Sequence, residues 1–103
     1  MQIHVDAATS PAGVELVNPD DFTAFSVVLH GASADSVRTT LAVIGRVDDD
    51  EHVFVGRDKL AALAGARTAD PTWLAQLDGM MEYAARHGWI DRGGRIRAHV
   101  ERR

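Results

Sequence analysis

The chain has 103 residues, of which 46% are hydrophobic and 25% charged, a composition typical of one soluble globular domain with a modest core. It contains no cysteine, which excludes disulfides and thiolate metal sites and favours a reducing cytoplasm. No apolar run approaches the ~20 residues of a membrane span. We therefore expect no membrane association, and the first residues lack the basic start and long apolar stretch of a signal peptide, so we expect no signal peptide either.

The charge is unevenly distributed along the chain. The formal net charge is −4, which argues against tight non-specific binding to nucleic acid. Residues 1–54 carry nine acids and two bases, whereas residues 55–103 carry six acids and nine bases. This division predicts an acidic lobe that carries a mildly basic one.

The first 32 residues predict a hairpin followed by a helix. Residues 2–6 alternate around Ile3 and Val5, turn-forming residues follow at 10–13, and residues 14–17 predict a second strand. Asn18-Pro19-Asp20-Asp21 is typical of a helix start, because Asn caps, proline suits the first turn and acids complement the helix dipole. The apolar residues of this expected helix are Phe22, Phe25 and Leu29, and Gly31 would end it.

The middle of the chain predicts a second helix and a strand. Ser33 can cap a helix whose inner face is formed by Val37, Leu41 and Ile44 and whose end lies at Gly45. Residues 48–51 are all acidic, which indicates a solvated loop. Residues 52–55 form a short β-rich run.

The C-terminal half predicts two helices and a hairpin. Residues 57–65 form a short helix, and Asp70-Pro71 starts a longer one that extends to residue 87. The longer helix has a buried stripe, which comprises Trp73, Leu77, Met80 and Ala84. Residues 95–100 alternate between apolar and basic side chains, so we expect them to form a strand that pairs antiparallel with residues 89–91.

This order of elements resembles the winged helix-turn-helix superfamily over roughly residues 33–101. The resemblance depends on the short helix, the longer helix, the segment Gly88-Trp89-Ile90 and the Gly93-Gly94 turn. It implies an α+β fold with a winged-helix-like three-helix core and a small antiparallel sheet. Residues 1–32 would add the N-terminal β-hairpin and helix, and residues 1–103 would form a single domain. The resemblance also implies a binding module and no enzyme.

For DNA binding, the resemblance implies contacts from the second helix, the turn before it and the wing. The candidate residues are Arg67, Thr68, Thr72, Gln76, Arg86, Arg92, Arg95 and Arg97. However, Asp78 and Glu82 lie on the same outer helix face and would repel phosphates. The second helix is also about one turn longer than the commonest pattern of the superfamily.

Motifs for catalysis or metal binding are absent from the sequence. The five histidines do not repeat at metal-ligand spacing, the acidic run lacks the alternation of a calcium loop, and no serine lies in a nucleophile motif. We therefore expect no cofactor.

Two functions remain open. The first is a DNA-binding transcription regulator. We expect it to be a homodimer, because a single small DNA-binding domain rarely makes enough specific contacts. The alternative is a protein-interaction module that uses the acidic lobe and the exposed helix face.

Overall fold

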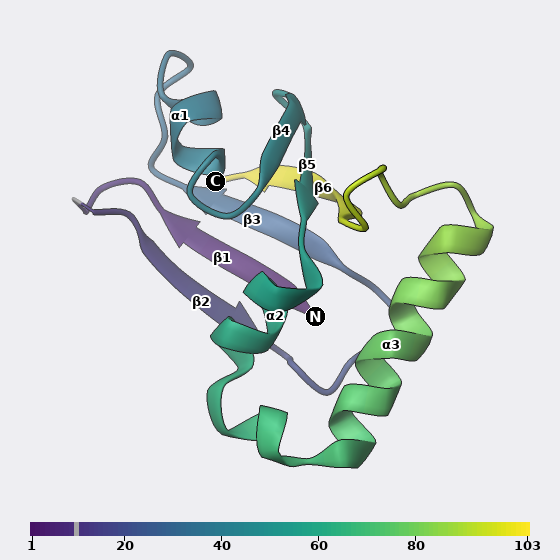
Figure 1. Ribbon diagram of the computed structural model, residues 1–103. Helices are drawn as coiled ribbons and strands as arrows, with labels where there is room; N and C mark the ends of the chain where they lie inside the picture. Colours follow the sequence, from purple (N-terminus) through teal and green to yellow (C-terminus); the bar gives the residue numbers. More distant parts are fainter. Residues whose placement is uncertain (10) are drawn as a thin grey trace.

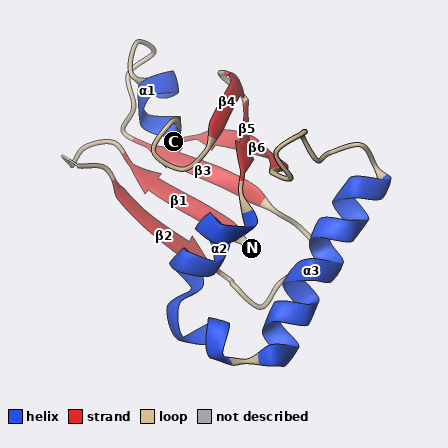
Figure 2. Cartoon of the chain, in the orientation of Figure 1, coloured by secondary structure: helices blue, strands red, loops and turns tan. Residues whose placement is uncertain are grey.

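A computed structural model describes residues 1–9 and 11–103 and shows one mixed sheet with helices on one side of it (Figures 1 and 2). The strands are β1 (Gln2–Asp6), β2 (Gly13–Val17), β3 (Ser26–His30), β4 (Arg46–Asp49), β5 (His52–Val55) and β6 (Ile96–Arg102). The helices are α1 (Val37–Leu41), α2 (Arg57–Ala64), the 3-10 helix η1 (Gly65–Ala69) and α3 (Pro71–Arg86). Ser10, part of the turn expected at 10–13, lies outside the described residues.

The sheet has six strands in the order β2-β1-β3-β6-β5-β4. β1 pairs antiparallel with β2 and parallel with β3, and β3 pairs parallel with β6. The expected class, α+β, is therefore confirmed, but the expected small antiparallel sheet is wrong, because the sheet is larger and two of its pairings are parallel. β6 lies between β3 and β5 and joins the N-terminal strands to the β4–β5 hairpin (Figure 1).

The helix expected at residues 18–31 is wrong. Asn18 has a φ of 51°, in the left-handed region, and residues 19–25 form a loop. The strand β3 follows, in which Val27 and Leu29 face the core cluster. The β-branched Val27 and Val28 favour this extended form, and β1 and β6 supply hydrogen-bonding partners on both sides.

The other expected elements are present with adjusted limits. α1 covers only Val37–Leu41, and its N-cap residue is Ser36, whose hydroxyl also accepts a hydrogen bond from the backbone of the expected cap Ser33. The acidic residues 48–51 form the end of β4 and the turn into β5. The helices expected at 57–65 and 70–87, and the strand expected at 95–100, correspond to α2, α3 and β6. The short pairing expected after α3 is confirmed by a bridge between Ile90 and Ile96.

The core lies between the helices and one face of the sheet. Val37 and Leu41 of α1, Leu60 of α2 and the stripe of α3 are buried in one cluster with alternate residues of the strands. The expected stripe is confirmed: Trp73, Leu77, Met80 and Ala84 are all buried. Within the described ranges, no helix is long and apolar enough to cross a membrane.

Candidate functional site

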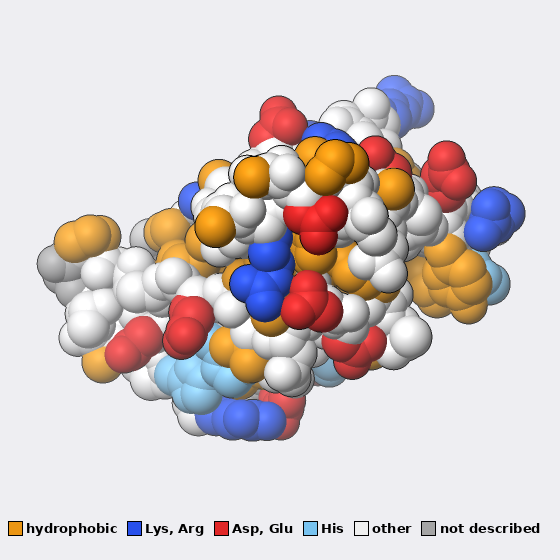
Figure 3. All heavy atoms as spheres, turned by 90° about the horizontal axis from the view of Figure 1, so that it is seen from below, with side chains coloured by type: hydrophobic (Ala, Val, Ile, Leu, Met, Phe, Trp, Pro, Cys, Tyr) orange, Lys and Arg blue, Asp and Glu red, His pale blue; other side chains and the backbone are white. Residues whose placement is uncertain are grey.

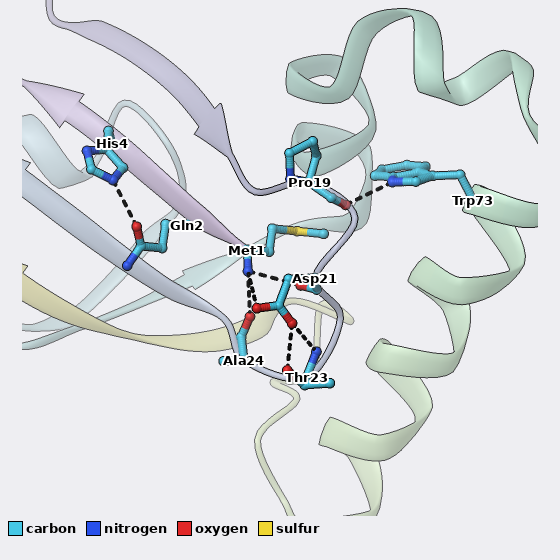
Figure 4. A network of polar contacts seen from close by, with 8 residues as sticks. All are labelled: Met1, Gln2, His4, Pro19, Asp21, Thr23, Ala24 and Trp73. Atoms are coloured by element: carbon cyan, nitrogen blue, oxygen red, sulfur yellow. Dashed lines mark hydrogen bonds and ion pairs between the residues drawn. The ribbon is translucent and has the colours of Figure 1, made fainter.

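The loop before β3 is fixed by three sets of polar contacts, the first of which joins it to α3 (Figure 4). The indole N–H of Trp73 donates to the carbonyl oxygen of Pro19 at 2.9 Å. The amino group of Met1 donates to the carbonyl oxygens of Asp21 and Ala24, each at 2.9 Å. The Asp21 carboxylate accepts hydrogen bonds from the side chain and backbone of Thr23, which lower its pKa. The loop is therefore fixed in position without regular secondary structure.

An apolar hollow of about 460 Å³ lies between this loop and α3. Its lining residues are Phe22, Thr23, Gln76, Gly79, Met80 and Tyr83. Phe22 also packs against Trp73, with the ring centroids 5.8 Å apart. We call this hollow the α3 groove.

Two large hydrophobic side chains stay exposed beside the α3 groove. Tyr83 is 51% exposed and Trp89 is 41% exposed. His87 connects them, since its ring centroid lies 4.4 Å from that of Tyr83 and 4.7 Å from that of Trp89. Hydrophobic side chains accordingly gather on the side of the molecule that carries α3 (Figure 3, right). An exposed aromatic cluster next to an apolar hollow is typical of a binding surface.

Gly79 lies at the middle of α3, where glycine is unfavourable by roughly 1 kcal/mol relative to alanine. A Cβ atom at this position would meet nothing within 4 Å. Contacts inside the molecule therefore do not explain why this residue is glycine. The glycine does leave the α3 groove open at its helical wall. This combination favours a role in binding.

Four of the five histidines lie on the sheet face opposite the core, namely His4, His30, His52 and His99. They form two pairs. The His4 Nδ1 and His30 Nε2 atoms are 2.9 Å apart, and the His4 Nε2 atom lies 3.0 Å from the Gln2 amide oxygen. Histidine side chains also gather beside acidic ones at the lower left of Figure 3.

The second histidine pair lies nearer the α3 groove. His52 hydrogen-bonds through Nδ1 to the Asp49 carboxylate at 3.0 Å, and its ring makes an edge contact with His99 at 5.5 Å. The Asp49 carboxylate accepts a hydrogen bond from the backbone N–H of Glu51. This bond and the contact to His52 lower the pKa of Asp49, and their effect exceeds the opposing effect of partial burial. Within residues 1–9 and 11–103, no three His, Cys, Asp or Glu side chains are arranged to hold a metal ion.

The structure gives the eight residues expected to contact DNA different local surroundings. Arg67 forms an ion pair with Asp20 at 3.1 Å and ties η1 to the loop before β3. The Thr68 hydroxyl donates to the carbonyl oxygen of Gly65. Thr72 is exposed in the first turn of α3, Gln76 lines the α3 groove, and Arg86 is exposed at the end of the helix.

The three arginines of the expected wing have different environments. Arg95 forms an ion pair with Asp91 at 2.9 Å, and Arg92 is exposed beside it. Arg97 lies on the open sheet face with its guanidinium 4.0 Å from Asp48. In addition, Asp78, which the sequence suggested would repel phosphates, forms an ion pair with Arg57 of α2 at 2.6 Å. The hydrogen bond from Arg57 to Asp78 raises the pKa of this arginine.

Asp91 is the centre of a polar clamp between β4 and the turn before β6. Its side chain is only 7% exposed and accepts from the guanidinium groups of Arg46 and Arg95 and from two backbone amides. Burial alone would raise the pKa of Asp91, but these hydrogen bonds outweigh burial and leave the pKa lowered. The clamp therefore requires the ionised carboxylate.

We expect Asp91→Asn to reduce the loss of stability in acid. A carboxylate whose pKa is lowered by folding stabilises the native state above its unfolded pKa of ~3.9 and loses this effect as the pH falls through the lower folded value. Chemical denaturation from neutral pH to about pH 2 should therefore show a smaller decrease for the variant, which starts less stable at neutral pH. Parallel curves for both proteins would contradict this role of Asp91.

Comparisons with known proteins identify no relative: no family model matches the chain, and no curated protein or solved structure is significantly similar to it. The candidate site therefore depends on its own geometry. The sequence placed Gln76 on the second helix among the candidate contacts, but it did not indicate the α3 groove, because residues 18–25 were expected to be helical. The signal that could have indicated it is a glycine inside a well-capped helix.

Proposed function

We propose that the chain is a protein-interaction module without catalytic activity, which binds an apolar side chain of a partner polypeptide in the α3 groove. The observation that carries this proposal is the pair of exposed aromatic side chains, Tyr83 and Trp89, beside an apolar hollow. Aromatic residues are enriched among those that dominate the energy of protein interfaces. The exposed helix face was one of the surfaces expected for this function from the sequence.

The rigidity of the site also supports the proposal. The Trp73–Pro19 hydrogen bond and the contacts of the Met1 amino group hold the loop that forms one wall. The other wall is α3, which is anchored by its buried stripe. A site that is ordered before binding loses less conformational entropy when a partner binds.

The second candidate function is a homodimeric DNA-binding regulator of the winged-helix type. The succession of α2, η1, α3 and the short pairing before β6 favours it, as do the exposed Arg86 and Arg92. The ion pairs of Arg67 and Arg95 favour the protein-interaction module instead, because carboxylates already neutralise these candidate DNA contacts. For either function we propose the reducing cytoplasm as the compartment, since the sequence has no cysteine.

We expect Gly79→Gln to weaken partner binding about tenfold or more, which corresponds to roughly 1.4 kcal/mol. The added side chain would occupy the α3 groove, while the helix gains a residue of better propensity. The matched control is Ala85→Gln, at an exposed position of the same helix that does not line the groove. The experiment is selection of displayed random peptides against the native chain, followed by measurement of the affinity of single clones for all three proteins.

The proposal requires that selected peptides share an apolar residue and lose affinity for Gly79→Gln but not for Ala85→Gln. Failure to enrich any peptide, or equal affinity for the two variants, would overturn it. A mobility-shift assay with duplex DNA at low salt, where non-specific attraction is greatest, tests the second candidate. A shift that is lost when Arg86 and Arg92 are both replaced by glutamine would support DNA binding.

A further inference from the structure

The α3 groove continues onto the open face of the sheet. A smaller hollow of about 80 Å³ shares Phe22, Thr23, Met80 and Tyr83 with it. A third hollow, of about 240 Å³, shares Phe25, Trp89 and Arg97 with the second and is also lined by His52 and His99. One continuous surface therefore leads from the apolar α3 groove to a second end, which is lined by the arginine and histidine side chains of Arg97, His52 and His99.

The guanidinium of Arg97 differs from most other arginines of the chain. Six arginines donate side-chain hydrogen bonds to carboxylates, namely Arg38, Arg46, Arg57, Arg67, Arg95 and Arg103. Among the described residues, no side-chain hydrogen bond joins Arg97 to a carboxylate, and its nearest one, on Asp48, is 4.0 Å away. Its backbone N–H is held by the carbonyl oxygen of Trp89 at 2.8 Å. The guanidinium is thus positioned at the groove with its donors available.

The neighbouring histidine is also oriented. The bond between His52 Nδ1 and Asp49 fixes which ring nitrogen faces the protein, so Nε2 is the nitrogen left for other contacts. Two carboxylates lie nearby on β4: that of Asp49 contacts the His52 ring, and that of Asp48 lies 4.0 Å from the Arg97 guanidinium. The Asp49 carboxylate is already engaged by His52 and by the Glu51 amide, whereas Asp48 is the carboxylate nearest to Arg97.

We infer that the partner segment carries a carboxylate close to its apolar side chain, and that this carboxylate binds Arg97 while the apolar side chain occupies the α3 groove. The inference rests on the proposed function and specifies the chemistry of the partner. Arginine binds carboxylates through paired N–H donors in a fixed geometry. Phe25 and Trp89 line the same hollow as Arg97, so a segment that binds there can contact their rings and the guanidinium together.

The test uses short synthetic peptides that contain one leucine and one aspartate at several spacings, with matched peptides in which asparagine replaces the aspartate. Binding to the ¹⁵N-labelled chain is followed by the indole N–H signals of its two tryptophans. We expect the exposed Trp89 to shift and the buried Trp73 to stay unchanged. The best aspartate peptide should bind roughly twofold to fivefold tighter than its asparagine partner, the range for a solvent-accessible ion pair.

Three variants assign this preference to a residue. Arg97→Gln should abolish it, and Asp48→Asn should increase it, because the competing carboxylate is removed. Arg92→Gln removes the same charge at an exposed position outside the groove and should leave the preference unchanged. The thermal unfolding midpoint of each variant shows whether it is folded.

The outcomes separate this inference from the proposed function. If the aspartate and asparagine peptides bind equally well and both lose affinity for Gly79→Gln, the inference fails while the function stands. If the preference persists in Arg97→Gln, or if Asp48→Asn weakens binding of the aspartate peptide, the inference is also overturned. A further outcome is that the leucine peptides all fail to bind while peptides selected by display do bind. In that case the inference requires that an acidic residue recurs among the selected peptides. Selected peptides without such a residue would refute the inference.

Discussion

Replacing Leu77 by alanine is expected to lower the free energy of unfolding by about 2–5 kcal/mol, the usual effect of removing a fully buried leucine side chain. Leu77 is completely buried at the middle of α3. It lies in the cluster that joins this helix to the sheet and to Leu60 of α2. The truncation would leave a cavity at the point where the helical layer meets the sheet.

Chemical denaturation, with the unfolding midpoint and slope as readouts, measures this effect. Leu74→Ala is the matched control, since Leu74 is only partly buried on the same helix. The control should lose clearly less stability. Equal losses in the two variants would show that α3 does not contribute its buried stripe to the core in solution.

Gly45→Ala is expected to lower the free energy of unfolding by about 1–3 kcal/mol, the range typical of overpacking. A Cβ atom at Gly45 would lie 2.0 Å from the backbone oxygen of Phe54 and 3.3 Å from the Cα atom of Val55. Backbone atoms of a paired strand cannot move away as the end of a flexible side chain can. The substitution therefore forces β4 and β5 apart.

Gly79→Ala provides a control that changes the same two residue types. A Cβ atom there meets nothing within 4 Å, so the variant should be more stable by roughly 0.5–1 kcal/mol through helix propensity. Thermal unfolding of the two variants side by side should show shifts of opposite sign. A stability of Gly45→Ala equal to that of the native chain would contradict the close approach of residue 45 to β5.

Local signals were sufficient to predict α3 and the segments around it. Asp70 caps the helix by accepting from the Thr72 amide at 2.9 Å, Pro71 occupies its first turn, and the buried stripe has helical spacing. The N-terminal hairpin and β6 followed from alternation of apolar residues. In each case the pattern that determines the element lies within the element itself.

The strand β3 could not be predicted in this way. Its hydrogen-bonding partners are β1 and β6, and Val27 is aligned with Val100, far away in the sequence. The proline and acids before it resemble a helix start, yet Asp21 instead binds Thr23 and the carbonyl oxygen of Asp21 accepts from the Met1 amino group. Tertiary contacts thus override a local preference here.

The candidate site was only partly accessible from the sequence for the same reason. Gln76 belongs to α3 and was placed correctly on its outer face, whereas Phe22 was assigned to a helix that does not form. The α3 groove forms where Trp73 binds the loop before β3, which the Met1 amino group also holds in place. Likewise, the ion pair between Arg67 and Asp20 joins residues that no spacing rule relates.

The central place of β6 has a consequence for the order in which the protein can be completed during synthesis. β3 and β5 each use β6 as a neighbour, and β6 consists of residues 96–102. While a ribosome still holds these residues, the two halves of the sheet have no strand between them, and each exposes an unpaired edge. Nascent chains in which β1 to β5 have left the ribosome but β6 has not are therefore expected to be the most prone to aggregation and the most dependent on chaperones.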